Sequence, residues 1–406
     1  MKKLQKMGEI INNPGKQDSS PENRRDGRNK HNALIIAAVI LAAIFIAGLL
    51  ITRDHLFPFK KESANLESKV QPHLLPPIAS DAVIPAEKTK EISLKIEEAS
   101  LVAVGDISFS RSVERMTKIH GPDYPFLEIR DYLQGADIVF GNLETPITPG
   151  REILTGEMIF RSNPGTELSL KDAGFNLLSL ANNHTMNFGI KGLEDTFKYL
   201  KQAGINYVGA GENDQEAYQP VYVEIKGVRI AFLAYQNQKI VPTPYGANSS
   251  RTGIAFMNTE KMAAAAKDAK QRAGLVVVSM HAGDEYVAKP NNTQINFAHA
   301  AVDAGADLVI GHHPHVVQTM EEYKGKYIFY SLGNFVFDQM WSQNTKRGLA
   351  IKIFFTETKV SGISFLPFVI ENYCQPRPAN ETESAQILQR LNFSLPDELA
   401  QSWSEE

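Results

Sequence analysis

The chain has 406 residues, and 43% of them are hydrophobic, so a sizeable core can be buried. Its formal net charge of −4 provides no basic surface, and no stripe of basic and aromatic residues is present, which makes nucleic acid a poor candidate partner. Cys374 is the only cysteine, which excludes an intrachain disulfide and a thiolate metal cluster. We expect Cys374 to be a buried free thiol.

The N-terminal part of the chain has the pattern of a membrane anchor. Residues 33–51 are uncharged and apolar, and a helix of this length, at about 1.5 Å per residue, crosses a hydrocarbon core of about 30 Å. We therefore predict a disordered cytoplasmic tail at 1–32, a single-pass transmembrane helix at 33–51 and an extended extracellular linker at 52–97. A cleaved signal peptide is the alternative, but the apolar run is not followed by a small-residue cleavage pattern.

Basic residues set the predicted orientation of this helix. They crowd together between Arg24 and Lys30, just before the apolar run, and are sparser after it, at Arg53, Lys60 and Lys61. Positive residues tend to stay on the cytoplasmic side of a membrane. We therefore expect a cell-membrane protein with a cytoplasmic N-terminus and an extracellular C-terminal domain.

Residues 98–375 are predicted to form one α/β domain, followed by a C-terminal tail at 376–406. Six continuous apolar runs, typical of strands buried on both faces, occur at 101–104, 138–140, 177–181, 275–280, 308–310 and 327–332. Helical segments between them stop at Gly174, Gly204 and Gly305, and a strand-like run follows each stop. This alternation predicts a layered α/β sheet with crossover helices.

Each apolar run ends on residues that could bind metal or phosphate. In open α/β sheets the ligand lies outside the carboxyl ends of the strands, so we expect these residues to converge on one crevice. The candidate ligands are Asp106, Asn142, Glu144, Asn182, Asn183, His184, His281, His313 and His315. Oxygen and nitrogen donors without sulfur suit divalent Mn, Fe or Zn. Two such ions, about 3.5 to 4 Å apart, can polarise a phosphoryl oxygen and create a hydroxide nucleophile.

A purely structural role is the alternative for each of these residues taken singly. An Asp or Asn after a strand is usually a helix cap, and a lone histidine is more often a hydrogen-bonded structural residue than a ligand. The sequence His313-Pro314-His315 is harder to explain in this way, because proline stiffens the turn and side chains at i and i+2 can point into the same space. His184 and His281 at other strand ends also favour the metal interpretation.

The strand ends also form an ordered set of motifs that spans nearly all of residues 98–340. The motifs are Gly105-Asp106-Ile107 with Arg111, Gly141-Asn142-Leu143-Glu144, Ala181-Asn182-Asn183-His184, His281-Ala282-Gly283 with Glu285-Tyr286, Gly311-His312-His313-Pro314-His315-Val316, and Ser331-Leu332-Gly333-Asn334-Phe335-Val336-Phe337-Asp338. This set resembles that of the CapA family, the bacterial poly-γ-glutamate capsule synthesis proteins, whose PgsA-type members also have an N-terminal anchor. The family is similar in fold to calcineurin-like metallophosphoesterases. The resemblance thus implies a four-layer αββα sandwich, with two sheets flanked by helices.

The resemblance further implies a dinuclear centre of divalent metal. The positions that match metal-site motifs are Asp106, Glu144 or Asn142, Asn183, His281, His313 and His315. It makes Asp106, Arg111 and His184 candidate catalytic residues, with His184 as an acid or a phosphate-orienting group. His312 falls outside the matching pair, so its replacement should matter less than that of His281 or His313.

Two positions depart from the phosphoesterase pattern. Ser108 stands where the first Asp-x-His motif has its histidine, which removes one ligand and puts full two-metal occupancy in question. Asn187 stands where many relatives have Asp, which weakens the idea that this position buffers His184.

The candidate substrate-binding residues are Arg111, Arg161, Glu285, Asn334 and Asp338. The planar guanidinium of arginine suits an anionic substrate, although a surface ion pair is the alternative for Arg111. Asn334 and Asp338 match a family motif, but they could instead close the final strand-loop turn. Tyr286 is either a lid aromatic or a packing residue.

The resemblance implies a membrane-anchored protein of poly-γ-glutamate (capsule) biosynthesis and export, whose partners are other subunits of the synthesis complex. The residues alone support a membrane-tethered, outward-facing, metallophosphoesterase-like domain. Two other hypotheses stay open. One is an extracellular metal-dependent phosphoesterase that acts on cell-wall or nucleotide phosphate substrates, and the other is a non-catalytic module that binds an anionic polymer.

Overall fold

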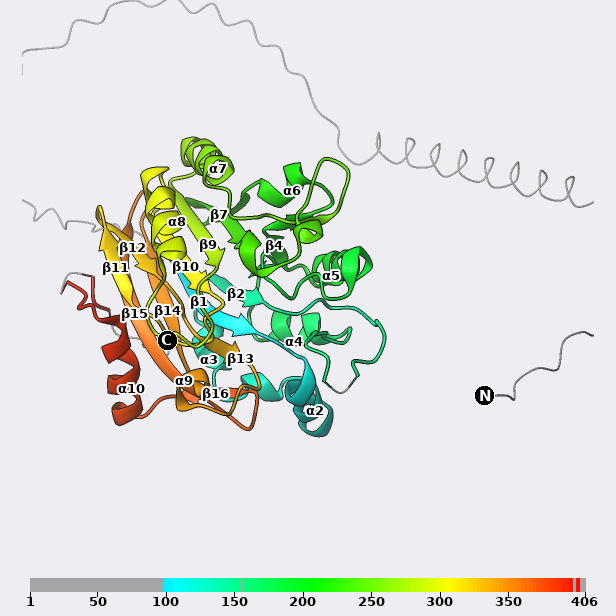
Figure 1. Cartoon of the computed structure of the whole chain (residues 1–406). Coiled ribbons are helices and arrows are strands. Elements are labelled where there is room, and N and C mark those ends of the chain that lie inside the picture. The colour runs from blue at the N-terminus through cyan, green and yellow to red at the C-terminus, as the bar shows by residue number, and fades with distance from the viewer. Residues whose placement is uncertain (1–97, 155, 397–398, 402–406) are drawn as a thin grey trace, which may run out of the picture. The chain divides into compact units, whose positions relative to one another are not determined.

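The computed structural model describes residues 98–154, 156–396 and 399–401 (Figure 1). The predicted cytoplasmic tail, transmembrane helix and linker at 1–97 lie outside these residues. Within the described part of the chain, every helix is too short or too polar to cross a membrane.

Strand β1 (Ala99–Ile107) runs through the middle of an eight-stranded mixed sheet. The order is β16-β15-β14-β1-β2-β3-β4, and β13 also pairs with β1. Strands β1 to β4 and β13 pair in parallel, whereas β14, β15 and β16 extend the sheet by antiparallel pairing. The remaining bounds are β2 (Ile138–Leu143), β3 (Leu177–Ser179), β4 (Asn206–Val208), β13 (Asn334–Val336), β14 (Arg347–Phe355), β15 (Val360–Glu371) and β16 (Gln375–Pro378).

A second sheet has six strands in the order β11-β12-β10-β9-β7-β6. Its four inner strands are parallel, and β6 and β11 close its edges by antiparallel pairing. The bounds are β6 (Val221–Ile225), β7 (Val228–Gln236), β9 (Leu275–His281), β10 (Leu308–His312), β11 (Met320–Tyr323) and β12 (Lys326–Phe329). Two short strands, β5 (Ala210–Gly211) and β8 (Gly253–Ile254), pair with each other and form a separate two-stranded sheet.

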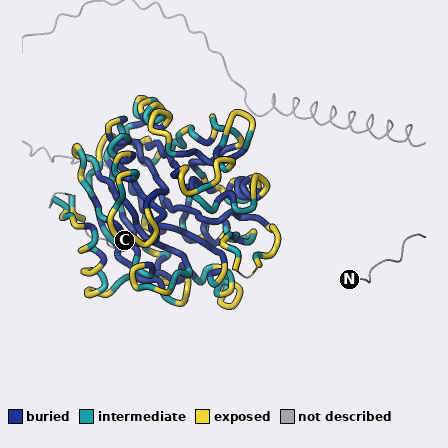
Figure 2. The backbone as a smooth tube through the Cα atoms, viewed as in Figure 1, coloured by how far each residue is buried: buried dark blue, intermediate teal, exposed yellow. Residues whose placement is uncertain are grey.

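The two large sheets pack face to face, and helices cover their outer faces. The core between the sheets includes Phe140 of β2 and Phe232 of β7, whose ring centroids are 6.0 Å apart. Helices α2 to α5 share a second core with the eight-stranded sheet, and α6 to α8 share a third with the six-stranded sheet. Buried residues accordingly lie mostly along the strands, while exposed residues lie in the outer loops and helices (Figure 2).

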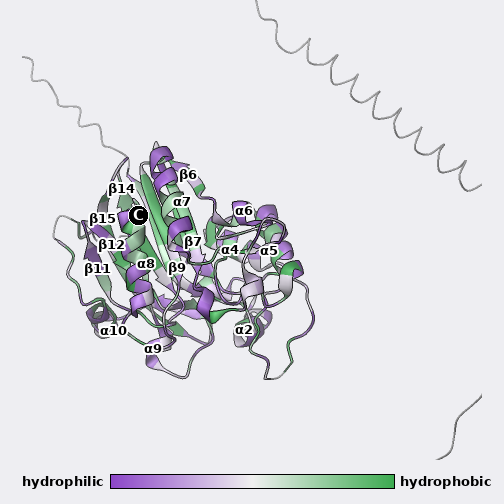
Figure 3. Cartoon of the chain, turned by 45° about the horizontal axis from the view of Figure 1, so that its top comes forward, coloured by the Kyte–Doolittle hydropathy of each residue, from purple (hydrophilic) through white to green (hydrophobic). Residues whose placement is uncertain are grey.

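The helices have the following bounds: α2 (Arg111–His120), α3 (Arg130–Gln134), α4 (Thr166–Asp172), α5 (Gly189–Ala203), α6 (Asp214–Tyr218), α7 (Thr259–Arg272), α8 (Asn292–Asp303), α9 (Gln343–Lys346) and α10 (Glu381–Leu388). Short 3-10 turns occupy Tyr124–Phe126, Gln238–Ile240, Thr243–Tyr245 and Gln389–Leu391. Hydrophobic colour concentrates on the strands in Figure 3, whereas α6 and α7 are mostly hydrophilic. This contrast is expected of helices that bury one stripe and expose the rest.

The predicted helix stops are confirmed. Gly204 caps α5 in the left-handed conformation, with φ 67°, and Gly174 and Gly305 follow α4 and α8 with φ 106° and 112°. Such angles are strained for residues with a Cβ, so glycine ends each helix and the chain turns into the next strand. The predicted mixed α/β architecture is confirmed too, and the six apolar runs divide between two sheets. The runs that begin at 101, 138 and 177 lie on β1, β2 and β3, and the later three lie on β9, β10 and β12.

The packed chain continues beyond residue 375, where the sequence analysis places the start of a tail. Strand β16 pairs with β15, and Ile387 of α10 and Leu391 are buried in the core between the sheets. The spacing of these two apolar residues places them on the same side of a helical turn, so the segment covers the edge of that core. Ala400 also bridges to Ile363 of β15.

Candidate metal centre and adjoining cleft

The carboxyl ends of strands from both sheets meet at one site. The eight-stranded sheet contributes Asp106 near the end of β1 and Glu144 directly after β2. The six-stranded sheet contributes His281 at the end of β9, and His313 and His315 in the turn after β10. All five side chains are buried. The structure therefore brings together these five predicted ligands from positions far apart in the sequence.

The turn that presents His313 and His315 is strained. Their φ angles are 97° and 57°, in a region that residues other than glycine rarely adopt. Gly311 lies in β10 just before the turn. Only glycine fits there, because a Cβ would lie 2.0 Å from the backbone oxygen of Tyr330. Strain of this kind is found mainly where the surrounding structure holds functional groups in place.

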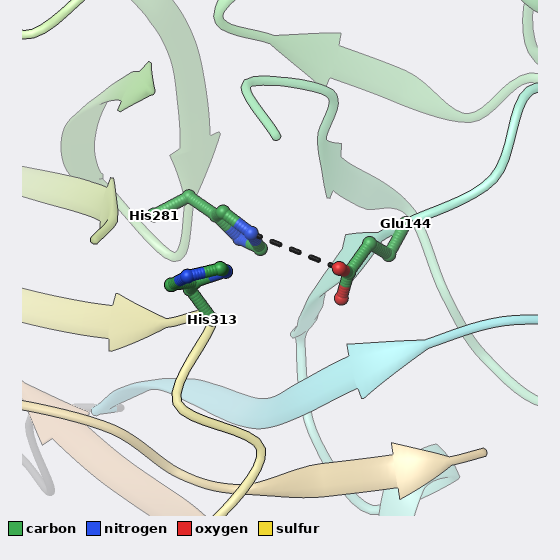
Figure 4. A group of neighbouring side chains, drawn as sticks. All are labelled: Glu144, His281 and His313. Atoms are coloured by element: carbon green, nitrogen blue, oxygen red, sulfur yellow. Dashed lines mark ion pairs between the residues drawn. The ribbon is translucent and has the colours of Figure 1, made fainter. Parts of the chain in front are cut away.

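Two groups of candidate ligands share Glu144. The first is Glu144, His281 and His313, and the second is Asp106, Glu144 and His315; the ligand atoms within each group all lie within 4.8 Å of one another. Oε1 of Glu144 lies 3.8 Å from Nε2 of His281 and 3.8 Å from Nε2 of His315. Figure 4 shows the first group, with His281 and His313 facing the Glu144 carboxylate. With Ser108 in place of a histidine, the second group has three side-chain ligands.

The Glu144 carboxylate is the part of the site that fits a metal most directly. Both oxygens are buried and accept no hydrogen bond from the described residues. Burial raises the pKa of Glu144 well above its usual range, and the nearby charge of Asp106 raises it further. A buried carboxylate normally has partners, because an unpaired one is costly. These buried groups can therefore hold divalent metal, and Glu144 belongs to both candidate groups.

The protonation of the histidines also suits metal binding. Burial lowers the pKa of His313 to about 3 and that of His281 well below its usual range, so both are neutral near pH 7 and have a lone pair to offer. Burial also opposes the charge on His315, but Glu144 and Asp106 outweigh it and raise the pKa of His315 to about 9. Burial opposes the charge on Asp106, but the nearby His312 and His315 rings outweigh it and lower the pKa of Asp106 well below its usual range. A cation bound here would replace the proton of His315.

Two asparagines near the strand ends orient the ligands. The Asn142 amide nitrogen donates to Oδ1 of Asp106 at 2.8 Å and lies 3.2 Å from Nδ1 of His281, while its oxygen accepts from Asn182 at 3.1 Å. Asn142 therefore holds two ligands in place and has its own oxygen engaged, although the sequence analysis proposes it as a ligand. Oδ1 of Asn183 lies 2.9 Å from Nε2 of His281, at the edge of the first group.

His184 points at the same centre, with Nε2 3.9 Å from Oε1 of Glu144. Its Nδ1 lies 2.8 Å from Oδ1 of Asn187, and that oxygen also accepts the backbone N–H of Phe160 at 2.7 Å. Asn187 thus fixes the tautomer with the proton on Nδ1 and leaves the Nε2 lone pair facing the site. Burial lowers the pKa of His184 to about 4, so the ring is neutral near pH 7.

A cleft of about 370 Å³ opens beside His184 and His315. Three of the predicted substrate-binding residues line it: Arg111, Glu285 and Asp338. Arg111 forms an ion pair with Asp338, and its guanidinium lies 4.4 Å from the centroid of the Phe160 ring. Arg111 is therefore both at the cleft and paired, which combines the two roles that the sequence analysis treats as alternatives.

The other two predicted substrate-binding residues lie elsewhere. Arg161 donates to the backbone oxygens of Thr148 and Pro149 and to the Asn163 side chain, in a neighbouring hollow that does not include His184. Asn334 is buried, and its Oδ1 lies 2.8 Å from Nδ1 of His315. It therefore orients a candidate ligand instead of facing the cleft.

Sequence reasoning missed four residues of the cleft wall: Met158, Phe160, Gln339 and Trp341. Phe160 stacks on His184 with ring centroids 3.9 Å apart, and Met158 and Trp341 lie on the rim. Trp341 comes three residues after Asp338, at the end of a motif that is visible in the sequence. Its exposure was the missing information, because an isolated tryptophan in a sequence is more often part of the core.

Comparison with known proteins identifies the family. Residues 100–339 match the family described as bacterial capsule synthesis protein PGA_cap, and the chain belongs to this family. It is 38% identical over 290 residues to the capsule biosynthesis protein CapA of Bacillus anthracis, covering 70% of each chain. It is 36% identical over 265 residues to the PGA biosynthesis protein CapA of Bacillus subtilis (strain 168), covering 64% of this chain and 69% of the relative. A probable polyglutamine synthesis accessory protein of Mycobacterium tuberculosis is 32% identical over 213 residues, which is 50% of this chain and 56% of the relative.

Solved structures show more distant likeness. A hypothetical protein from Thermus thermophilus aligns over 67% of this chain and 100% of its own length, with 16% identity and a TM-score of 0.44. The sulfate thiohydrolase SoxB of Thermus thermophilus aligns over 70% of this chain and 50% of its own, with 12% identity and a TM-score of 0.39.

Proposed function

We propose that this chain acts in the production and export of capsular poly-γ-glutamate, through a domain with a metallophosphoesterase-like site. The names of its relatives support the first part, since two are capsule or PGA biosynthesis proteins called CapA. Two packed sheets with helices on both outer faces are the arrangement expected of the calcineurin-like metallophosphoesterases, and support the second part.

The observation that carries the site proposal is the position of Glu144. Its two buried oxygens, which accept no hydrogen bond from the described part of the chain, lie between two groups of buried donors, one with His281 and His313 and the other with Asp106 and His315. Carboxylate and imidazole donors of this kind suit Mn, Fe or Zn, and two such ions supply Lewis acidity toward a phosphoryl oxygen. His184 faces the same space with a free lone pair, so it can accept and orient a proton of the bound group at Nε2.

We further propose that residues 33–51 anchor the chain in the cell membrane, with the domain outside the cell. The distribution of basic residues around that apolar run supports this orientation. Other subunits of a polymer synthesis assembly are the proposed partners, because relatives carry the description of accessory protein.

The test combines metal content with polymer yield. In the native host, Glu144→Gln should lower capsular poly-γ-glutamate to the level of a deletion strain, and the purified full-length variant should lose most of its bound metal. Glu128→Gln is the matched control, because it makes the same chemical change at an exposed position. Normal polymer with the Glu144 variant would contradict a role for the site, and equal metal content would contradict Glu144 as a ligand.

A phosphoesterase that acts on cell-wall or nucleotide phosphates is the second candidate. The shared carboxylate and the neutral His184 favour it over a binding module that requires only positive charge. Of the described residues, those that line the cleft include one arginine, Arg111, which is already paired with Asp338. Normal polymer in the Glu144→Gln strain, together with hydrolysis of a simple aryl phosphate by the purified wild type and not by the variant, would favour this candidate.

A further inference from the structure

The cleft beside the metal centre has a rim of exposed apolar side chains. Met158, Trp341 and Tyr286 all line it, and they expose 74%, 64% and 41% of their surfaces. Large apolar residues that are this exposed around one opening are a common mark of a ligand site. They come from different loops: the one before Phe160, the one after β9 and the one after β13.

The aromatic residues of the rim are held in a defined arrangement. The Tyr286 and Trp341 rings meet edge to face, with centroids 4.7 Å apart, and Tyr286 also stacks over His315 with centroids 6.1 Å apart. The amide of Gln339 donates to the Tyr286 hydroxyl at 3.4 Å. Tyr286 has a φ of 66°, so its backbone is held in a conformation that is unfavourable for a tyrosine. The aromatic surface therefore adjoins a candidate metal ligand directly.

The charges of the cleft do not suit a polyanion. Arg111 is neutralised by Asp338, Glu285 adds a negative charge to the lining, and the charge of His315 is offset by Asp106 and Glu144. Beyond the metal centre, a chain of repeated carboxylates would be repelled by Glu285 and would meet only the uncharged rim. A ligand with one anionic group and an uncharged remainder avoids that repulsion and buries the apolar rim.

We propose that Trp341, Tyr286 and Met158 form a subsite for the uncharged, apolar or planar substituent of an organic phosphate whose anionic group binds at the metal centre. This inference rests on the proposed metal site and adds the class of ligand. Stacking on the exposed Trp341 ring selects the substituent, while the metal-ligand residues hold the anionic group.

Two non-hydrolysable probes with the same anionic group provide the test. The full-length chain, loaded with Mn²⁺, is titrated calorimetrically with methylphosphonate and phenylphosphonate. We expect phenylphosphonate to bind about 3- to 10-fold more tightly, the factor that one aromatic contact supplies. Trp341→Ala should bring the ratio close to one without changing methylphosphonate binding.

Ile119→Ala is the control, because Ile119 is 65% exposed on α2 and is not part of the cleft lining. It should leave the ratio as in the wild type. In a Trp403→Phe background, Trp341 is the single tryptophan of the chain, and its fluorescence should change with phenylphosphonate only.

The outcomes separate the two proposals. If neither phosphonate binds to the metal-loaded chain, the metal site is wrong and the subsite falls with it. If both bind equally, or if Trp341→Ala keeps the ratio, the metal site stands and the subsite is wrong. Tighter binding of a short oligoglutamate than of phenylphosphonate would also overturn the inference.

Discussion

His312 matters more in the structure than its place in the motif indicates. It is fully buried, and its Nδ1 lies 3.5 Å from Oδ1 of Asp106. The sequence analysis expects its replacement to matter less than that of His281 or His313, because it lies outside the matching pair. A buried imidazole beside a buried carboxylate nevertheless helps to orient that carboxylate, and such supporting partners influence metal affinity.

We therefore expect His312→Ala to lower the free energy of unfolding by about 1–3 kcal/mol, because it removes a fully buried ring whose centroid lies 6.1 Å from that of Phe140. Metal affinity should fall by about 10- to 100-fold through the loss of Asp106 orientation. Urea unfolding and metal titration measure the two effects. The control is His299→Ala. His299 lies on α8 and pairs with Glu321, so its removal should leave metal affinity unchanged. Unaltered affinity in His312→Ala would restore the sequence-based expectation.

His184 provides a pH dependence with a defined sign. Its pKa is lowered by burial from 6.5 to about 4, so on acidification the unfolded chain takes up this proton before the folded protein does. The stability that comes from a neutral His184 is therefore complete above pH 6.5 and is lost as the pH falls toward 4. Asn187→Asp places a negative charge beside Nδ1 and should raise the pKa of His184. A ¹⁵N NMR titration of the metal-free wild type and variant measures the pKa of His184. Identical titration curves for the two proteins would show that Asn187 does not set the charge of this ring.

At the scale of elements, the C-terminal helix α10 is a part of the core. Ile387 is fully buried between the sheets. We expect Ile387→Ala to destabilise the protein by about 2–5 kcal/mol, the usual effect of removing a large core side chain. Thr382→Ala, at an exposed position of the same helix, should change stability little. Thermal unfolding of both variants distinguishes a packed helix from a dispensable tail, for which the two variants would behave alike.

Other elements explain where sequence reasoning succeeded. Continuous apolar runs identified β1, β2, β3, β9, β10 and β12, because strands buried on two faces need apolar residues at every position, but the inner strand β7 was not among them. Strands β14 and β15 were not among the predicted runs, although they are 9 and 12 residues long. Their hydrophobic residues are interrupted by polar ones such as Lys352 and Ser364, and no ligand motif marks their ends. The two strands pair with each other as a hairpin, and the antiparallel pairing of β14 with the distant β1 sets their place in the sheet.

The candidate site was predictable in its membership and less so in its roles. Residue types and strand-end positions were enough to nominate Asp106, Glu144, His281, His313 and His315. The direction of an amide or a guanidinium was not, because it depends on neighbours from other segments. Asn142 and Asn334 turn toward other ligands, and Arg161 turns to backbone oxygens, for reasons that only the assembled structure contains.

At the scale of the whole molecule, the orientation in the membrane is open to direct measurement. In intact cells stripped of their wall, added protease should digest the domain that begins at residue 98, since the basic residues before the apolar run predict that this domain is outside. Tagged N-terminal sequence should stay protected until lysis. A domain that is degraded only after lysis would reverse the topology and exclude an extracellular role.

The candidate metal donors belong to the two halves of the sandwich, with Asp106 and Glu144 at the end of one sheet and His281, His313 and His315 at the end of the other. Metal bound by donors from both sheets would link the two sheets, so any sliding of one sheet against the other would change the spacing of the donors. The complete set of donors can assemble only after synthesis has passed residue 315 and the two sheets have packed together. Metal uptake by this protein would then report that the two sheets have packed together, and a chain truncated before His313 should take up none at this site.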